Sequence, residues 1–456
     1  MTSLRGLALG CLLPGFEGTA PPDWVRRRVA DGLGGVVLFA RNVESDDQVR
    51  RLTDALRAER ADVVVAIDEE GGDVTRLEAR SGSSFPGNLA LGFAGDASLT
   101  REVAAQMGAR LRAAGVDLNL APVVDVNSNP RNPVIGVRSF GADASAVSRH
   151  AAAWIEGMQG AGVAATAKHF PGHGDTALDS HVAVPVATDD PRLRALEPFK
   201  AAIAAGVRAI MSAHIVVPAL DDLPATISPR IMTELLRDEL GFGGVAISDG
   251  LDMAGLSAER GIPEAGVLAL AAGCDVLCIG GGPSDESVVD ALVSAIVTAV
   301  EDGRLSEDRL HGMANLKISP PFTGESPAQR AEGVVPEASR RAICSDGDIH
   351  VGGEVNLIHV DSPGSIAAGD IPWGLGSSLT NRGVRITPKG RVVIEVRDLA
   401  RRNQAAVEEL LARHPDAVLV EMGVPAYRPP QARAYVATHG SARVLADAAA
   451  AKMAAT

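Results

Sequence analysis

The 456-residue sequence has few aromatic side chains, no long hydrophobic run and no dense run of basic residues. Aromatic residues make up only 3% of the chain, whereas 46% is hydrophobic and 49 residues are glycine, a balance typical of a soluble α/β protein with many tight turns. Because no stretch of about 18 apolar residues exists, we expect no membrane span. The net charge of −14 argues against a nucleic-acid partner.

Cysteine is scarce as well, and the chain has four, Cys11, Cys274, Cys278 and Cys344. They lack a zinc-binding spacing, and the pair at 274 and 278 lies in an apolar run, so we expect buried free thiols there and neither a metal nor a cofactor. The apolar residues Leu7–Leu13 resemble a weak signal peptide, but Pro14-Gly15-Phe16 stands where a small-residue cleavage site is expected. We therefore predict that this run is the first strand of a cytoplasmic protein.

Eight short, strand-like apolar runs precede residue 285. They are Leu7–Pro14, Gly35–Phe39, Val63–Asp68, Asp117–Val123, Ala164–His169, Ala209–His214, Gly244–Asp249 and Cys274–Ile279. Most are continuous rather than alternating, which is typical of strands buried on both faces of a parallel sheet. Helical patterns lie between them, at Asp46–Glu59, Leu99–Ala114, Ala144–Gln159, Asp190–Ala205 and Arg230–Leu240. Eight repeats in about 310 residues predict an α/β fold of the (β/α)8, TIM-like barrel type, with a doubly wound sheet as the alternative.

A second, smaller domain is predicted after the barrel. Residues 319–337 are rich in proline and glycine and read as a linker between a barrel of residues 1–318 and a domain of residues 338–456. The pattern there indicates a small α/β layered, sandwich-like domain. We expect strands at Val355–Val360, Val392–Val396 and Ala417–Met422, and helices at Asp398–Arg413, Pro429–Thr438 and Ala446–Ala455. This domain has no catalytic constellation, so we expect a structural or packing role for it.

Reactive side chains are densest in residues 168–176, Lys-His-Phe-Pro-Gly-His-Gly-Asp-Thr, followed by Asp179-Ser180-His181. This stretch begins where a predicted strand ends. Other polar groups also fall at predicted strand ends, namely Asp68, Glu69, Glu70, Asp125, Asn127, Arg138, His214, Ser248 and Asp249. In a barrel these ends converge on one mouth, and charged groups beside a buried run are costly unless they are paired or used.

Three chemistries fit such a mouth. A purely structural explanation also stays open for two residues, with Asp125 capping the following helix or turn and His214 as a core histidine whose hydrogen bonds are made within the fold. One of the three chemistries is metal-assisted hydrolysis by His169, His173, His181 and His214. Barrel amidohydrolases of that kind place a pair of histidines at the end of the first strand, and Leu7–Pro14 has none. The other two are sugar binding without catalysis and glycoside cleavage by a carboxylate nucleophile with a separate acid.

Six ordered motifs in the first domain are similar to those of family 3 glycoside hydrolases, in the β-N-acetylglucosaminidase branch. They are GGVVLFARN at 34–42, DEEGG with Val74 and Arg76 at 68–76, NLAPVVDV at 119–126, IGVRSF at 135–140, KHFPGHG with DSH at 168–181, and SDGL with Met253 at 248–253. The DSH triplet argues against the β-glucosidase branch. The sequence departs from the common pattern of these motifs at Glu69, Asp73 and Gly250. These departures bear on fine substrate specificity rather than on catalysis.

The resemblance implies that Asp249 is the nucleophile and that His181, paired with Asp179, is the general acid/base. Imidazolium can protonate the leaving oxygen, and neutral imidazole can then activate water, so that the sugar leaves with retained configuration. An adjacent carboxylate orients the ring and favours its protonated form. The resemblance also implies a set of substrate-binding residues, Asp68, Arg76, Arg138, Lys168, His169, His173 and Met253.

The implied substrate is a terminal β-linked N-acetylglucosamine, from peptidoglycan or chitin-derived fragments, and this small carbohydrate is the only partner we expect. Two alternatives stay open. A histidine does not repel an incoming anion as a carboxylate would, so phosphate could replace water and the protein would be a phosphorylase. The other alternative is a sugar-binding protein without catalysis. The sequence does not distinguish a monomer from a homodimer.

Overall fold

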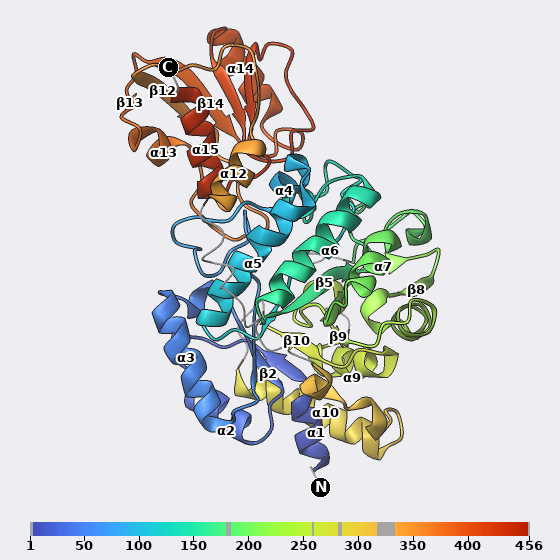
Figure 1. Cartoon of the computed structure of the whole chain (residues 1–456). Coiled ribbons are helices and arrows are strands. Elements are labelled where there is room, and N and C mark those ends of the chain that lie inside the picture. The colour runs from blue at the N-terminus through green and yellow to red at the C-terminus, as the bar shows by residue number, and fades with distance from the viewer. Residues whose placement is uncertain (1–2, 179–183, 258–259, 281–284, 317–332, 455–456) are drawn as a thin grey trace.

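The computed structural model describes residues 3–178, 184–257, 260–280, 285–316 and 333–454. Figure 1 shows a larger body, coloured blue to yellow, below a smaller orange-red one that contains the C-terminal end of the chain. Within the described residues no helix is both long enough and apolar enough to span a membrane.

The larger body is built on eight parallel strands. They are β1 (Leu12–Pro14), β2 (Gly35–Leu38), β3 (Val64–Ile67), β4 (Leu118–Asn119), β5 (Ala164–Phe170), β6 (Ala209–Ser212), β9 (Val245–Ile247) and β10 (Leu277–Ile279). Strands β2, β3, β4, β5, β6 and β9 form a parallel sheet in chain order, and β1 pairs with β10. Between β6 and β9, the short strands β7 (Val216–Val217) and β8 (Asp221–Pro224) form a separate antiparallel pair. A parallel bridge from Ile247 to Val276 joins β9 to the start of β10, and β1 lies against β2. The predicted TIM-like barrel is thereby confirmed.

Burial explains why these short runs become strands. Every residue of the eight strands is buried, because side chains on one face fill the barrel and those on the other meet the surrounding helices. Leu13, Val37 and Ile247 belong to the interior cluster, whereas Leu12, Val36 and Ala246 belong to the cluster under the helices.

Helices surround the barrel in Figure 1. They are α1 (Leu4–Gly10), α2 (Asp23–Ala30), α3 (Asp46–Glu59), α4 (Asn88–Ala94), α5 (Ala97–Ala113), α6 (Ala144–Gly160), α7 (Leu196–Ala204), the π-helix η5 (Arg230–Glu239), α8 (Ala254–Ser257), α9 (Ile262–Ala272) and α10 (Glu286–Glu301). Helix α3 is typical, since Val49, Leu52 and Leu56 are buried on one face and Ser45 caps its first turn by accepting from Gln48 N.

Two sequence-based predictions of secondary structure are wrong. Residues Leu7–Pro14 were expected as one strand, but Leu4–Gly10 form α1 and only Leu12–Pro14 is extended. Ser3 caps this helix by accepting from Gly6 N, and periodicity cannot separate a helix from a strand in so short an apolar run. Residues Pro429–Thr438 were expected as a helix, but Ala434–Ala437 form a buried strand whose partners lie on both sides of it.

Two predicted helices also change their bounds. The predicted helix Asp190–Ala205 is split into a short 3-10 turn, η3 (Pro191–Leu193), and α7 (Leu196–Ala204). The predicted helix Asp398–Arg413 begins only at Gln404, because Asp398 and Asn403 have positive φ.

The second domain is a six-stranded sheet between helices. Its strands are β11 (Cys344–Asp346), β12 (Glu354–His359), β13 (Arg385–Ile386), β14 (Arg391–Val396), β15 (Val418–Glu421) and β16 (Ala434–Ala437), in the order β11-β16-β15-β14-β12-β13. Its helices are α12 (Val334–Arg341), α13 (Gly376–Thr380), α14 (Gln404–Arg413) and α15 (Arg443–Ala454). Alternate residues of β14 face opposite clusters, Val393 with α13 and α15, and Ile394 with α14. The predicted layered α/β domain is confirmed.

The predicted domain limits stay a prediction. Most of the proposed linker, residues 317–332, lies outside the described residues, and α12 begins at Val334, before the expected end of the linker at residue 337.

The carboxyl ends of the second domain's parallel strands lie against the barrel. The segments after β12 and β14 border a small cavity together with barrel residues Asp73 and Val134–Arg138. Asp73 accepts hydrogen bonds from both the backbone N and the hydroxyl of Ser441, each at 2.7 Å. This contact ties the acidic side chain at position 73 of the barrel to the second domain.

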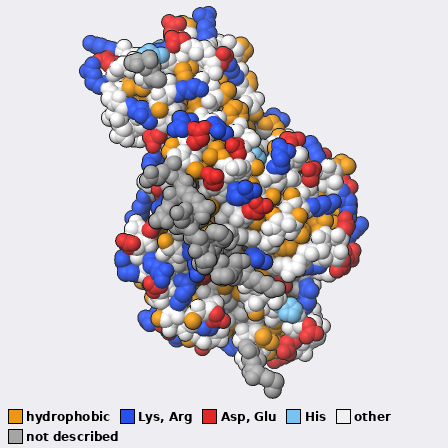
Figure 2. Space-filling view, in the orientation of Figure 1, with side chains coloured by type: hydrophobic (Ala, Val, Ile, Leu, Met, Phe, Trp, Pro, Cys, Tyr) orange, Lys and Arg blue, Asp and Glu red, His pale blue; other side chains and the backbone are white. Residues whose placement is uncertain are grey.

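Ion pairs add to this junction, with Arg341 at 3.1 Å from Asp96 and Arg443 at 3.3 Å from Glu78. Figure 2 shows acidic and basic side chains close together where the two bodies meet, and both signs are interspersed over the rest of this face.

Candidate active site

A cavity of about 590 Å³ opens at the carboxyl ends of the barrel strands, a size typical of small-molecule sites. Eight of the predicted site residues line it, Asp68, Arg76, Arg138, Lys168, His169, His173, Asp249 and Met253. The other two, Asp179 and His181, lie outside the described residues. The structure therefore brings together side chains from segments between residues 68 and 253, as expected of a barrel mouth.

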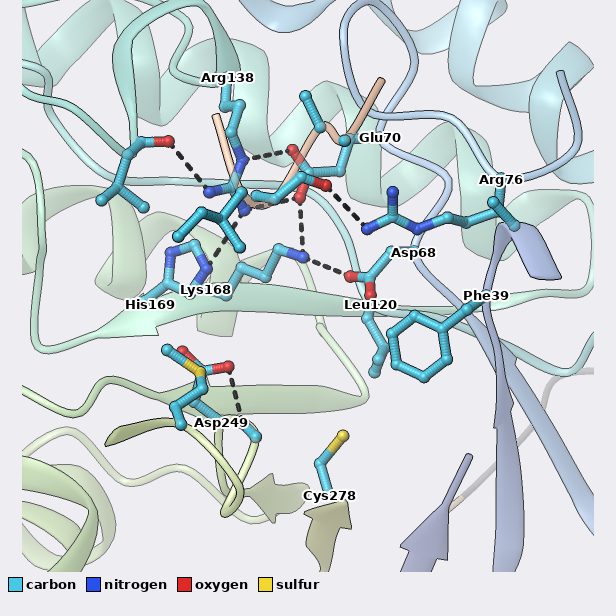
Figure 3. Close-up of a pocket in the computed structure, with 18 of the residues that line it drawn as sticks. Phe39, Asp68, Glu70, Arg76, Leu120, Arg138, Lys168, His169, Asp249 and Cys278 are labelled. Carbon is cyan, nitrogen blue, oxygen red and sulfur yellow. Dashed lines mark hydrogen bonds and ion pairs between the residues drawn. The ribbon is translucent and has the colours of Figure 1, made fainter. Parts of the chain in front are cut away.

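One side of the cavity holds a buried cluster of alternating charges (Figure 3). Arg138 donates to both oxygens of Glu70, from Nε at 2.9 Å and from Nη2 at 2.8 Å. Lys168 Nζ lies 2.7 Å from Asp68 and 2.8 Å from Glu70. Bidentate and charge-assisted pairs of this kind fix each group in place without help from solvent. We call these four residues the charged cluster.

The electrostatics of the charged cluster keep Glu70, Arg138 and Lys168 ionised. Burial alone raises the pKa of Glu70, but the adjacent Arg138 and Lys168 outweigh it and hold that pKa well below its usual range. Burial likewise lowers the pKa of Lys168, yet Asp68 and Glu70 raise it above its ordinary value. The cavity therefore offers fixed, fully charged donors and acceptors.

Glu70 is a residue whose importance the sequence did not single out. It is 3% exposed and touches both cations of the charged cluster, so it organises the groups that were predicted to bind substrate. The signal was present in the motif at 68–76, where Asp68, Glu69 and Glu70 are adjacent. Only the turn of the chain after β3 decides which carboxylate faces the cavity, because Glu69 points away and accepts from the backbone N of Arg76 and Leu77.

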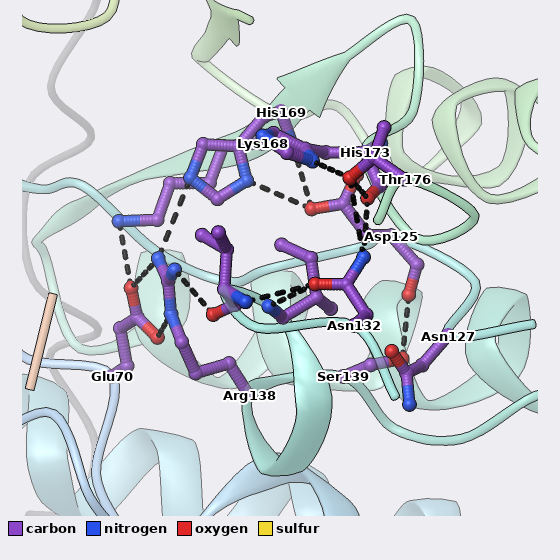
Figure 4. A network of polar contacts seen from close by, with 12 residues as sticks. Glu70, Asp125, Asn127, Asn132, Arg138, Ser139, Lys168, His169, His173 and Thr176 are labelled. Carbon is purple, nitrogen blue, oxygen red and sulfur yellow. Dashed lines mark hydrogen bonds and ion pairs between the residues drawn. The ribbon is translucent and has the colours of Figure 1, made fainter. Parts of the chain in front are cut away.

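Asp125 holds the histidines of the same mouth (Figure 4). Its carboxylate lies 2.8 Å from His169 Nδ1 and accepts from the backbone N of His173 at 2.6 Å. Burial raises the pKa of Asp125, but its electrostatic interaction and hydrogen bonds with His169 and the bond from His173 N bring that pKa below its ordinary value. The ring of His169 is thus oriented by a buried carboxylate, with Nε2 facing Arg138 Nη2 at 3.4 Å. Asp125 acts here as a support rather than as a cap of a following helix.

His173 is buried more deeply than His169. Burial lowers the pKa of His173 to about 4, so its ring is neutral at physiological pH. Nδ1 lies 2.6 Å from the hydroxyl of Thr176, and Asn132 Nδ2 donates to the His173 carbonyl at 2.8 Å. These contacts close the loop that follows β5.

Asp249 stands two residues after the end of β9, across the cavity from Glu70 and Arg138 in Figure 3. Its Oδ1 accepts from Gly250 N at 2.8 Å, and the carbonyl of Gly250 in turn accepts from His214 Nε2 at 2.9 Å. His214 is wholly buried and also contacts Thr226 at 2.8 Å, so it supports the turn that presents Asp249. This agrees with the structural explanation considered for His214.

Part of the cavity wall comes from the second domain, which the sequence did not predict. Residues 366–371, after β12, line the cavity, and the carbonyl of Ala367 accepts from Arg76 Nη2 at 2.9 Å. A purely structural or packing role for this domain does not account for that wall.

The cysteines take no part in a metal site in the described residues. Cys274 and Cys278 are buried free thiols, as predicted, and burial raises the pKa of the Cys274 thiol to about 12. Across the described ranges, no group of three histidine, cysteine or acidic side chains is arranged to hold a metal ion.

Residues 22–315 match the family described as the N-terminal domain of glycosyl hydrolase family 3. The chain belongs to this family. It is 33% identical over 389 residues to beta-hexosaminidase A of Pseudoalteromonas piscicida, covering 76% of this chain but only 65% of that relative. It is 38% identical over 321 residues to the beta-hexosaminidase of Alkalilimnicola ehrlichii, covering 67% of this chain and 90% of the relative.

The fold of the whole chain also has a solved counterpart. A family 3 beta-N-acetylglucosaminidase from Paenibacillus sp. strain FPU-7 superposes with a TM-score of 0.88 at 31% identity, covering 100% of this chain and 97% of that one. The second domain is therefore shared with that structure. The predicted family, and a glycoside hydrolase of the β-hexosaminidase type, are confirmed.

Proposed function

We propose that this family 3 enzyme is a retaining exo-β-N-acetylglucosaminidase that removes a terminal β-linked N-acetylglucosamine from peptidoglycan or chitin-derived fragments. The observation that carries the proposal is the position of Asp249, which faces the charged cluster across one cavity. The names of the relatives, beta-hexosaminidases and a beta-N-acetylglucosaminidase, support the substrate class. A cytoplasmic role in recycling such fragments is part of this proposal and rests on the resemblance.

Asp249 attacks the anomeric carbon and forms a covalent glycosyl-enzyme. The carboxylate of Asp249 accepts a hydrogen bond from Gly250 N, and the carbonyl of Gly250 in turn accepts one from His214. A nucleophile fixed in this way needs little reorganisation when the sugar arrives, which lowers the entropic part of the barrier.

The charged cluster, with Arg76 and His169, binds the hydroxyl groups of the terminal sugar. Buried charged donors and acceptors make stronger hydrogen bonds to neutral hydroxyls than neutral groups do. Because Asp68 and Glu70 together balance Arg138 and Lys168, the cavity carries strong donors without a large excess of charge. Dense binding of one terminal unit opposite the nucleophile favours exo-action.

His181, paired with Asp179, is proposed as the acid that protonates the leaving oxygen and as the base that then activates water. This assignment rests on the DSH triplet alone. Phosphate is the other possible acceptor, and it would yield N-acetylglucosamine 1-phosphate.

The first test compares release of 4-nitrophenol from the β-N-acetylglucosaminide and from the β-glucoside, each with and without phosphate. We expect turnover of the N-acetyl substrate alone, at a rate that phosphate does not change, with free N-acetylglucosamine as product. A sugar 1-phosphate that forms only when phosphate is present would show that the protein is a phosphorylase rather than a hydrolase. Binding of N-acetylglucosamine without turnover of either substrate would contradict the assignment of Asp249.

A further inference from the structure

The segment between β12 and α13 carries a tight turn that reaches the sugar cavity. Ile366, Ala367, Gly369 and Asp370 line the cavity, and the side chain of Ile366 is 58% exposed although it is a large aliphatic residue. The backbone N of Gly369 donates to the Ser365 carbonyl at 3.0 Å, which closes the turn. An exposed aliphatic side chain at the rim of a binding cavity is the kind of group that packs against a ligand.

The second domain holds this turn in place through side chains at the ends of its own strands. Arg397, after β14, donates from Nε to the Ser362 carbonyl at 2.7 Å and lies over the ring of Trp373 at 4.8 Å. Glu395 accepts from Leu375 N at 2.6 Å and contacts His359. Both ends of residues 362–375 are therefore anchored, so the turn is a fixed wall rather than a free loop.

Arg76 is the point at which this wall meets the barrel. The backbone of Arg76 is held by Glu69, but the contact found for its guanidinium is the one from Nη2 to the Ala367 carbonyl. Its Nε is buried and finds no hydrogen-bond partner among the described residues. The barrel thus supplies the side chain, and the second domain fixes where its charged tip lies in the cavity.

We propose that residues 364–370 of the second domain form a wall of the site for the terminal N-acetylglucosamine and position Arg76 to bind that sugar. This inference rests on the proposed function and deepens it. The segment acts on sugar affinity and leaves the chemical step to the barrel. Ile366 contacts the sugar itself, whereas Ala367 acts through Arg76.

The main test is a double-mutant cycle on the full-length protein. A Cβ added at Gly364 would collide with the carbonyl of Gly369, so the two ends of the turn meet and Ser365–Ala368 can be replaced by a single glycine. This excision, Arg76→Met and the two combined are each titrated with N-acetylglucosamine by calorimetry and assayed with 4-nitrophenyl β-N-acetylglucosaminide. Melting temperature and near-ultraviolet circular dichroism report on folding.

Arg76→Met should raise the Kd and KM about tenfold, the expected loss of one hydrogen bond from a charged group. The excision also removes Ile366, so it should raise them about thirtyfold. The combined variant should bind about as weakly as the excision alone, because the excision already removes the contact that positions Arg76. The kcat for this activated substrate should stay within about a factor of three. If the fold-changes in Kd of the two changes multiply in the combined variant, the segment does not act through Arg76. If the excision leaves the Kd unchanged, residues 364–370 do not form a wall of the sugar site.

If the excised protein does not fold, a matched pair of point variants still tests the proposal. Ile366→Ser should raise the Kd about threefold by removing apolar contact with the sugar. Ile386→Ser, at another exposed isoleucine of the same domain that does not line the cavity, should leave the Kd unchanged. Equal effects of the two would refute the proposal. A wild-type protein that neither binds nor cleaves the sugar would instead refute the proposed function.

Discussion

The two domains both present charged strand ends toward the same region, yet they use them differently. In the barrel, Asp68 and Asp249 follow buried strands, Lys168 lies near the end of β5, and all three line a cavity. In the second domain, Glu395, Arg397 and Glu421 stand near strand ends as well, but they bind backbone atoms of neighbouring segments of the same domain. A charge at the end of a parallel strand therefore marks a functional site only where the following loops leave a cavity in front of it.

The two buried glutamates make the comparison sharpest. Glu70 faces two cations, and its pKa lies well below the ordinary range. Glu421 accepts from the backbone N of Asp398, Leu399 and Gly423, yet burial dominates and raises its pKa to about 8. The barrel glutamate is thus a permanent anion within a functional cavity, and the other is a largely protonated structural group.

The largest effect should come from replacing the nucleophile. Asp249→Asn removes the group that attacks the anomeric carbon, so kcat with 4-nitrophenyl β-N-acetylglucosaminide should fall by about 10⁴-fold or more. The matched change in the second domain, Glu421→Gln, should leave kcat unchanged. A similar loss in both variants would mean that the second domain takes part in the chemistry, and the contrast between the domains would be broken.

The next largest effect concerns the proposed acid. His181→Ala should slow cleavage of N,N′-diacetylchitobiose by about 10²- to 10⁴-fold, because its leaving alcohol needs a proton. The 4-nitrophenyl substrate should be slowed far less, since nitrophenolate leaves without protonation. The test is the cleavage rate of both substrates, measured side by side in the variant and the wild type. An equal loss of rate on both substrates would mean that His181 is not the acid.

Glu70 and Glu421 are both buried, but replacing them should change the stability of the protein by different amounts. Glu70→Gln leaves Arg138 and Lys168 without their common anion, so the free energy of unfolding should fall by about 3–5 kcal/mol. Glu421→Gln replaces a largely neutral carboxyl by an amide of the same shape and should cost less than about 1 kcal/mol. Urea denaturation at pH 7 measures both, and equal costs would show that the charged cluster is no more than packing.

The smallest effect is a pH dependence. Because the pKa of Glu421 is raised in the folded state, its contribution to stability is full below the ordinary value of 4.5 and is lost as pH rises towards about 8. The wild type should therefore lose stability relative to Glu421→Gln by up to about 1.4 kcal/mol per pH unit across this window. Denaturation of both proteins at pH 5, 6 and 7 gives the difference, and a constant difference would mean that Glu421 is ionised throughout.

Much of the barrel could be predicted because its information is local. Seven of the eight expected strands contain the observed ones, since continuous apolar runs such as Gly244–Asp249 need burial on both faces. The eight described site residues line one cavity because the ends of parallel strands converge. The failures at α1 and β16 arose where a short segment takes its structure from partners distant in the chain.

The sequence by itself determined which residues end the buried strands, and through its motifs the family. Tertiary structure alone decided that Glu70 rather than Glu69 enters the cavity, and that a turn of the second domain completes it. Arg76 and Ala367 are 291 positions apart, so no local pattern could join them. Their contact depends on how two separately packed domains meet, and that is set by shape and burial across the whole interface rather than by the residues on either side of each partner.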